Sequence, residues 1–144
     1  QMSPNSANAY EDVAEVEFAR GQFGDALRDY TERAARHEQG DPFDLGVTQL
    51  FLGDYGPAIE NFREFEVQSP KAAAGPLFNA AALQLSGKEE EALSQAGLYR
   101  KLKTDDADWT VLAQSHEPAF LAAASRMRRA LHQVGLDEPG SEGR

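Results

Sequence analysis

The sequence contains no cysteine among its 144 residues. Disulfide bonds and thiolate metal sites are therefore excluded, and cysteine usage does not indicate a redox compartment. Long apolar runs are missing as well, because no stretch approaches the roughly eighteen consecutive apolar residues of a membrane span. The sequence therefore predicts no membrane insertion, and the cytoplasm is the expected location.

A signal peptide is not recognisable either. Residues 1–10 lack the basic segment and the following apolar run that mark one. Gln1 precedes Met2, which suggests an excised fragment or a cloning remnant, so a signal peptide removed earlier stays open as an alternative.

Basic residues are scarce, with 14 Lys and Arg against 24 Asp and Glu, for a formal net charge of −10. A nucleic-acid binder needs Lys and Arg to neutralise phosphates, and that interaction supplies most of its non-specific affinity. The basic residues that are present gather near 100–103 and 126–129. Helix C-termini favour cations at such positions. Nucleic acid is therefore not an expected partner.

Histidine is scarce too: the chain has three, His37, His116 and His132, and no two of them have the spacing of a zinc site. The acidic run at 105–108 lacks the ligand spacing, turn glycine and closing glutamate of a calcium loop. Sequence neighbours on a helix point in different directions, so Ser115–Glu117 does not form a catalytic relay. A glycine-rich phosphate loop is also missing. The sequence therefore predicts no catalytic residue, no metal ligand and no cofactor, and hence a protein that is not an enzyme.

What the sequence does contain is an internal repeat. Gly21, Gly53 and Gly87 lie 32 and 34 residues apart, and each is followed five residues later by alanine and then by an aliphatic residue. Glycine reaches the left-handed backbone region that closes a helix without steric cost, and the small alanine lets the next helix approach its neighbour. The pattern predicts three helix–turn–helix hairpins.

A period near 34 residues resembles that of the tetratricopeptide repeat family. The middle segment matches the family pattern best, through a Leu-Gly pair, an alanine with phenylalanine four residues on, and a closing proline: Leu45, Gly46, Ala58, Phe62 and Pro70. It departs from the pattern at Pro42, where tryptophan is usual, and at Gln49, where tyrosine is usual. The outer segments match less well. The alternative is an unrelated helical bundle with a chance period.

The resemblance implies an all-α fold of about three tetratricopeptide hairpins in a right-handed superhelical stack, with a C-terminal capping helix. The expected domain covers residues 1–135, with repeats at about 7–40, 41–72 and 73–104 and capping helices at 105–135. A stack of repeats leaves an apolar end that a final helix can cover. Residues 136–144 are polar and are expected to be disordered.

Helix boundaries agree with this division. Asp41 precedes Pro42, which is the arrangement of an N-cap followed by proline at the first helical position. After the repeats, Trp109 to Leu112 predict a short helix. Ser115 is the expected N-cap of a longer helix that Gly135 ends.

In the tetratricopeptide family, the first helices of successive hairpins line a concave groove that accepts a partner segment. Projecting that face onto this sequence predicts a partner-binding groove formed by Asn8, Glu11, Asp12, Glu15, Phe43, Asp44, Val47, Phe51, Leu77, Phe78 and Ala81. This groove would be acidic at its N-terminal end and apolar in the middle. Phe43 and Phe78 are the expected principal contacts, because exposed aromatic residues mark interaction sites.

The charge of this groove selects among partners. Some family members hold the acidic C-terminal tails of heat-shock chaperones with Lys, Asn and Arg, whereas the matching positions here include Glu11, Glu15 and Asp44. Like charges cost affinity and slow the encounter. The expected partner is therefore a protein or peptide with apolar anchors and a basic flank.

Two alternatives stay open. Small acidic proteins of three such repeats resemble the type III secretion chaperones, which hold an apolar segment of a client. Alternatively, the repeat faces serve self-association, which would give a homodimer. The Arg-over-Lys and alanine-rich usage is typical of GC-rich bacterial genomes.

Overall fold

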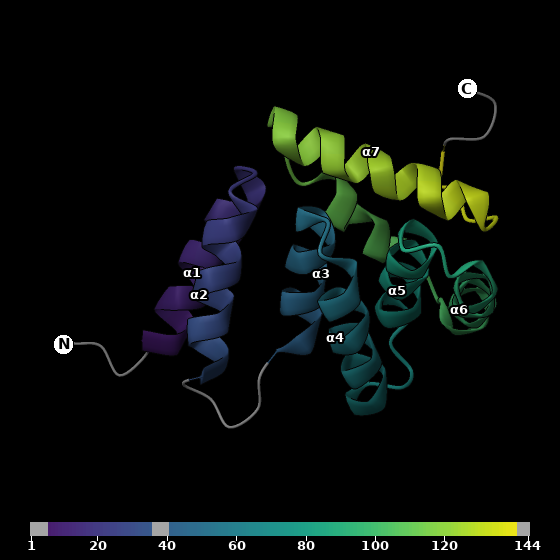
Figure 1. Cartoon of the computed structure of the whole chain (residues 1–144), viewed down its shortest axis with the longest axis horizontal. Helices are drawn as coiled ribbons and strands as arrows, with labels where there is room; N and C mark the ends of the chain where they lie inside the picture. The colour runs from purple at the N-terminus through teal and green to yellow at the C-terminus, as the bar shows by residue number, and fades with distance from the viewer. Residues whose placement is uncertain (1–5, 36–40, 141–144) are drawn as a thin grey trace.

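The computed structural model describes the backbone of residues 6–35 and 41–140, and the side chains from residue 12 onward in those ranges. Over this part of the chain the fold is all-α: eight helices pack in chain order as adjacent pairs, without a strand (Figure 1). The helices are α1 (Ser6–Ala19), α2 (Phe23–Ala35), α3 (Pro42–Leu52), α4 (Tyr55–Gln68), α5 (Ala74–Leu85), α6 (Glu89–Leu102), the 3₁₀ helix η1 (Ala107–Ala113) and α7 (Pro118–Gln133).

The three helix pairs are closed by the turns that the glycine spacing predicts. Gly21, Gly53 and Gly87 have φ of 79°, 88° and 86°, in the left-handed region. In each turn the residue after the glycine donates its N–H to the carbonyl five residues back, at 2.8–2.9 Å. This bond satisfies a carbonyl group that the end of the helix leaves open. The predicted hairpins α1–α2, α3–α4 and α5–α6 are confirmed.

The α3–α4 pair depends on a close approach at Gly46. A Cβ placed on this residue would lie 2.8 Å from Cε1 of Phe62. The ring of Phe62 is fully buried in the space that the missing side chain leaves. At the start of α3, Asp41 is the predicted N-cap: its Oδ1 accepts a hydrogen bond from the Asp44 N–H at 3.3 Å.

Helix α7 does not extend the series of pairs; it crosses α3 and α5 near their ends (Figure 1). Its first turn contacts the turn between α1 and α2, because a Cβ on Gly21 would lie 2.9 Å from Cβ of Ala119. Near its middle, Arg126 Nη2 donates to the carbonyl of Phe51 at 3.1 Å. A cation at this position compensates the partial negative charge of the C-terminus of α3. Helix α7 therefore connects all three hairpins.

Phe120 of α7 forms the centre of that connection. Its ring centroid lies 5.4 Å from that of Phe18, 6.3 Å from Phe23 and 5.0 Å from Phe51. These rings come from α1, α2 and α3, and all four are buried. Aromatic pairs at this separation contribute about 0.5–1.5 kcal/mol beyond their burial.

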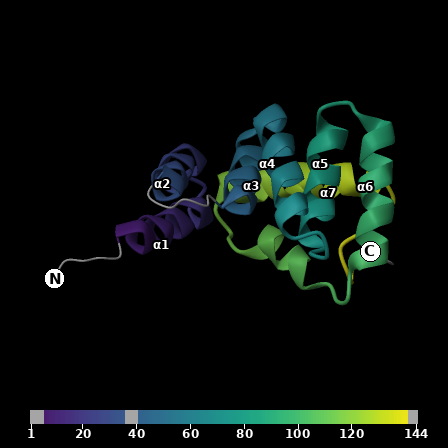
Figure 2. The same ribbon diagram turned by 90° about the horizontal axis from the view of Figure 1, so that it is seen from below.

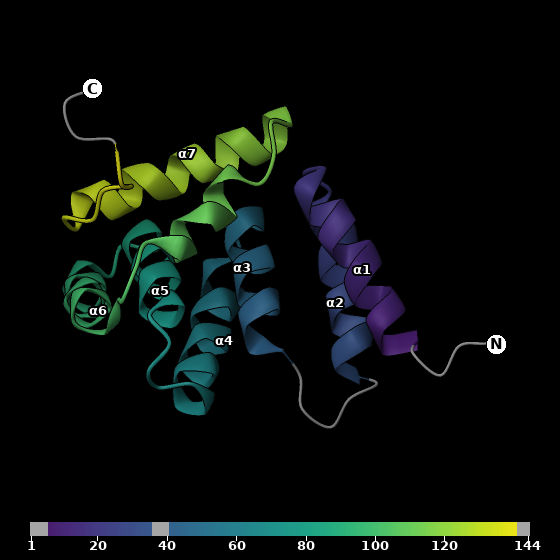
Figure 3. The ribbon, with the colours of Figure 1, turned by 180° about the vertical axis from the view of Figure 1, so that it is seen from behind.

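The segment between α6 and α7 returns across the molecule on the side where α1 lies (Figures 2 and 3). Helix η1, which confirms the short helix predicted near Trp109, is fixed to α6 by a buried hydrogen bond. The indole Nε1 of Trp109 donates to the hydroxyl of Tyr99 at 3.0 Å. Leu112 is also buried, and its carbonyl accepts from Arg128 of α7 at 2.9 Å. This segment therefore contributes Trp109 and Leu112 to the core.

Two predictions near the C-terminus need correction. Ser115 is not the N-cap of α7, because the helix starts at Pro118 and the Ser115 hydroxyl instead accepts the Glu117 N–H within the preceding turn. Of the predicted disordered tail 136–144, the described part packs against the fold: Leu136 is buried and Glu138 pairs with Arg128 at 2.8 Å. Residues 141–144 lie outside the described ranges.

Searching the described residues for a helix long and apolar enough to cross a bilayer gives no candidate.

Candidate functional site

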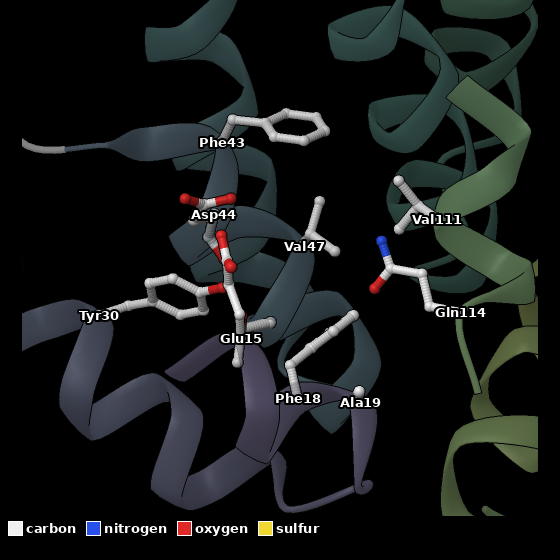
Figure 4. Close-up of a pocket in the computed structure, with 10 residues that line it drawn as sticks. Glu15, Phe18, Ala19, Tyr30, Phe43, Asp44, Val47, Val111 and Gln114 are labelled. Atoms are coloured by element: carbon white, nitrogen blue, oxygen red, sulfur yellow. The ribbon is translucent and has the colours of Figure 1, made fainter. Parts of the chain in front are cut away.

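The candidate site is a cleft between the first helices of the first two pairs, with η1 forming its far wall (Figure 4). Its volume is about 470 Å³, within the range of small-molecule and side-chain pockets. We call it the α1–α3 cleft. It is lined by Glu15, Phe18 and Ala19 from α1, Tyr30 from α2, Phe43, Asp44, Val47 and Thr48 from α3, and Val111 and Gln114 from the η1 segment.

One part of the cleft is apolar. Phe18 and Val47 face it from α1 and α3, and Val111 faces it from η1 (Figure 4). Phe43 is half-buried, since its ring also packs against Phe65 at 4.9 Å between centroids. These side chains belong to, or pack against, the hydrophobic core, so the helices hold them in place. The cleft therefore has a firm apolar wall.

The other part of the cleft is acidic. Glu15 and Asp44 both line the cleft, together with Tyr30 (Figure 4). They belong to α1 and α3, so that each comes from one side of the cleft. Asp44 is fixed through its backbone, because its N–H bonds to Asp41 and its carbonyl accepts from the hydroxyl of Thr48 at 2.8 Å. Among the described residues, the cleft lining contains these two carboxylates and no Lys or Arg.

The structure brings together part of the predicted groove. Glu15, Phe43, Asp44 and Val47 all line the α1–α3 cleft. Asp12 is exposed on α1 but does not line it. The side chains of Asn8 and Glu11, both predicted groove residues, lie outside the described residues.

The remaining predicted groove residues are core instead. Leu77, Phe78 and Ala81 have no exposed surface, and Phe51 is 2% exposed. The ring of Phe78 packs between those of Phe43 and Phe62, at centroid distances of 5.7 and 6.4 Å. The assignment of these four residues to an open groove is therefore corrected. The physical reason is that these side chains pack between helices: Phe78 against rings of α3 and α4, and Phe51 against rings of α1, α2 and α7.

Six lining residues were not predicted: Phe18, Ala19, Tyr30, Thr48, Val111 and Gln114. Phe18 and Ala19 lie three and four residues after Glu15, on the same helix face, so that continuing the helical period by one turn would have found them. Val111 and Gln114 carry no comparable signal. They reach the cleft only because the chain returns along the first-helix side after α6.

Outside the cleft, two further features could supply chemistry: groups of metal-ligating side chains and acids with a shifted pKa. No group of three or more Asp, Glu and His placed to hold a metal ion occurs among the described residues. Among the described acids whose pKa is shifted, Glu17 on α1, next to Asp29 of α2, has the largest shift. Partial burial and the nearby carboxylate of Asp29 raise the pKa of Glu17 to about 7. Glu17 does not line the cleft, so this shift concerns the packing of the first hairpin.

Comparison of the sequence with protein-family models gave no match, and comparison with curated proteins gave none either.

Proposed function

We propose that this protein is a scaffold of tetratricopeptide type that binds a segment of a partner protein in the α1–α3 cleft. The observation that carries the proposal is the cleft itself, which combines an apolar wall with two carboxylates and lies between the first helices of successive pairs. The glycine period, the turn geometry and the close packing at Gly46 support the repeat assignment, with α7 as the closing helix of a right-handed stack.

The proposed binding site is shorter than the groove of an open repeat array. Because Val111 of η1 and Gln114 just after it line the cleft, the bound segment would contact α1, α3 and the η1 segment, and would not extend along α5. Burying one or two apolar side chains contributes about 1.5–3 kcal/mol each. After the cost of ordering the segment, the expected dissociation constant is of about micromolar order.

The absence of cysteine allows a direct test. Ala19→Cys places a single thiol in the lining of the cleft, whereas Ala122→Cys places one on the exposed face of α7. Each variant is labelled with the same bulky maleimide. Peptides selected from a displayed library against the unmodified chain are then measured by isothermal titration. We expect the adduct at position 19 to abolish binding and the adduct at position 122 to leave it unchanged.

Equal binding to both adducts would place the peptide site elsewhere and refute the proposal. Acidic peptides among the tightest ligands would contradict it as well, since the cleft carries two carboxylates. Light scattering after size exclusion tests the competing role in self-association: a stable dimer that buries the cleft would favour that role over partner binding.

A further inference from the structure

Over the described residues, the series of helix pairs stops at two open ends. Inside the series, the second helix of each pair packs against the first helix of the next, as α2 does against α3 and α4 against α5. At the ends, α1 packs mainly against α2 and α6 mainly against α5, and these two pairs lie at opposite ends of the molecule (Figure 2). Helix α7 crosses α3 and α5 instead of forming the next pair beyond α6 (Figure 1). Helices α1 and α6 therefore each have a side that inside the series would meet a neighbouring pair.

The open side of α1 carries two half-exposed valines. Val13 and Val16 are each 50% exposed. The equivalent positions of α3 and α5, counted back from the turn glycine, are less exposed: Leu45 is half-buried, and Thr48, Asn79 and Ala82 are buried. Asn79 shows what such a position contacts, because its Nδ2 donates to Oε2 of Glu66, on the preceding helix α4, at 3.1 Å. The same face of α1 has no preceding pair to pack against.

The open side of α6 carries an exposed leucine. Leu93 is 54% exposed, whereas its equivalents in the earlier pairs are covered: Ile59 of α4 is buried and Leu27 of α2 is half-buried. One turn further along α6, a Cβ on Gly97 would have no atom within 4 Å. Leu93 also borders an open cleft of about 370 Å³ beside the end of α7. Helix α6 therefore offers an apolar side chain, and space in which another helix can approach it closely.

The charges on these two helices are complementary in the geometry that the series uses. Sequential helices joined by short connections run antiparallel, so a second copy added at α6 in the same way would set its α1 antiparallel to α6. Asp12 near the start of α1 would then lie towards Lys101 at the end of α6, and Arg20 just after α1 towards Glu90 in the first turn of α6. All four side chains are exposed. Opposite charges would meet at both ends of the contact, which favours a second copy of this chain as the occupant.

We propose that copies of this chain associate head to tail, with Val13 and Val16 of α1 in one copy packing against Leu93 and Gly97 of α6 in the next. The contact joins two different surfaces, so each pair of copies keeps one open end of each kind and growth does not stop at a dimer. Three exposed apolar side chains bury far less than a standard interface of about 1,600 Å², so the association is weak and needs high protein concentration. The proposal does not depend on what the α1–α3 cleft binds, because none of these four residues lines it.

The test is sedimentation velocity of the full chain from micromolar to millimolar concentration. We expect the average mass to rise with concentration and to pass that of a dimer. Val16→Glu and Leu93→Glu each place a charge in the contact and should weaken association about tenfold, because that charge would be buried without a partner. The matched control is Val67→Glu, which adds the same charge at an 81% exposed valine of α4 and should have no effect. Circular dichroism checks that each variant keeps its helical fold.

Mixing the two end variants tests the head-to-tail geometry itself. The Val16→Glu copy keeps an unaltered α6 and the Leu93→Glu copy keeps an unaltered α1, so an equimolar mixture should form a complex that stops at a dimer. Covalent trapping gives a second measurement, since the chain has no cysteine of its own. A short bismaleimide should link Val16→Cys to Leu93→Cys in a mixture, and should link neither variant to itself or to Val67→Cys.

The other outcomes overturn the proposal. A chain that stays monomeric up to millimolar concentration and gives no cross-linked product refutes it. A dimer that Val16→Glu dissolves and Leu93→Glu leaves intact would indicate a symmetric contact between two α1 helices. Equal weakening by Val67→Glu would attribute the effect to added charge alone. The maleimide adduct at position 19 separates this proposal from partner binding, because it should abolish peptide binding and leave association unchanged; loss of association in that adduct would mean that copies bind through the cleft.

Discussion

Replacing Phe120 with alanine tests whether α7 holds the three hairpins together. Phe120 is fully buried against rings from α1, α2 and α3, so its removal leaves a cavity where these three helices meet α7. Truncation of a buried phenylalanine to alanine costs about 3–5 kcal/mol. We expect a loss in this range for the free energy of unfolding.

The chain has a single tryptophan, Trp109, which is buried in η1 and reports on unfolding without interference from another indole. Urea unfolding is followed by Trp109 fluorescence and by far-ultraviolet circular dichroism, and the two curves are compared. The control is Leu121→Ala at the next position, where the side chain is 41% exposed and the expected cost is about 1 kcal/mol or less. If Phe120→Ala costs no more than the control, α7 does not stabilise the assembly of hairpins as described.

Two further predictions concern helix packing and pH. Gly46→Ala should lower the free energy of unfolding by about 1–3 kcal/mol, because the added Cβ would lie 2.8 Å from the ring of Phe62. The control is Gly97→Ala, which has no atom within 4 Å of the added Cβ. In the same urea unfolding assay it should raise the free energy of unfolding by about 0.5–1 kcal/mol. The raised pKa of Glu17, about 7 against an ordinary 4.5, means that folding takes up a proton between these values. The melting temperature should therefore fall as the pH rises from 5 to 8, and Glu17→Gln should reduce this fall; an unchanged pH profile in the variant would contradict the assignment.

The hairpins could be predicted from sequence because their signals are local. A glycine at a helix end, followed by a capped helix, specifies a turn through backbone conformation alone, and Gly21, Gly53 and Gly87 all adopt the predicted left-handed geometry. The repeat period then follows from counting. The resemblance of these hairpins to the tetratricopeptide family remains a proposal.

The site was predicted only in part, because its walls depend on contacts between distant segments. Phe43 and Phe78 both lie in the first helix of a hairpin, but Phe43 precedes its turn glycine by ten residues and Phe78 precedes its own by nine. They therefore differ by one position in the repeat, and one position on a helix changes the direction of the side chain. In the structure Phe43 is half-buried at the cleft, while Phe78 is fully buried. Phe78 is buried against the rings of Phe43 and Phe62. The cleft beside Phe43 is completed by Val111 and Gln114, and no local pattern in residues 103–117 specifies the path that brings them there.

The most direct test of the α1–α3 cleft is an amide chemical-shift map of the isotopically labelled chain, titrated with a peptide selected against it. Binding in the cleft predicts that the largest shifts fall on Glu15, Val47 and Val111, which belong to three separate helices and meet only there. Shifts that instead cluster on α4 and α6, with those three amides unchanged, would contradict the account.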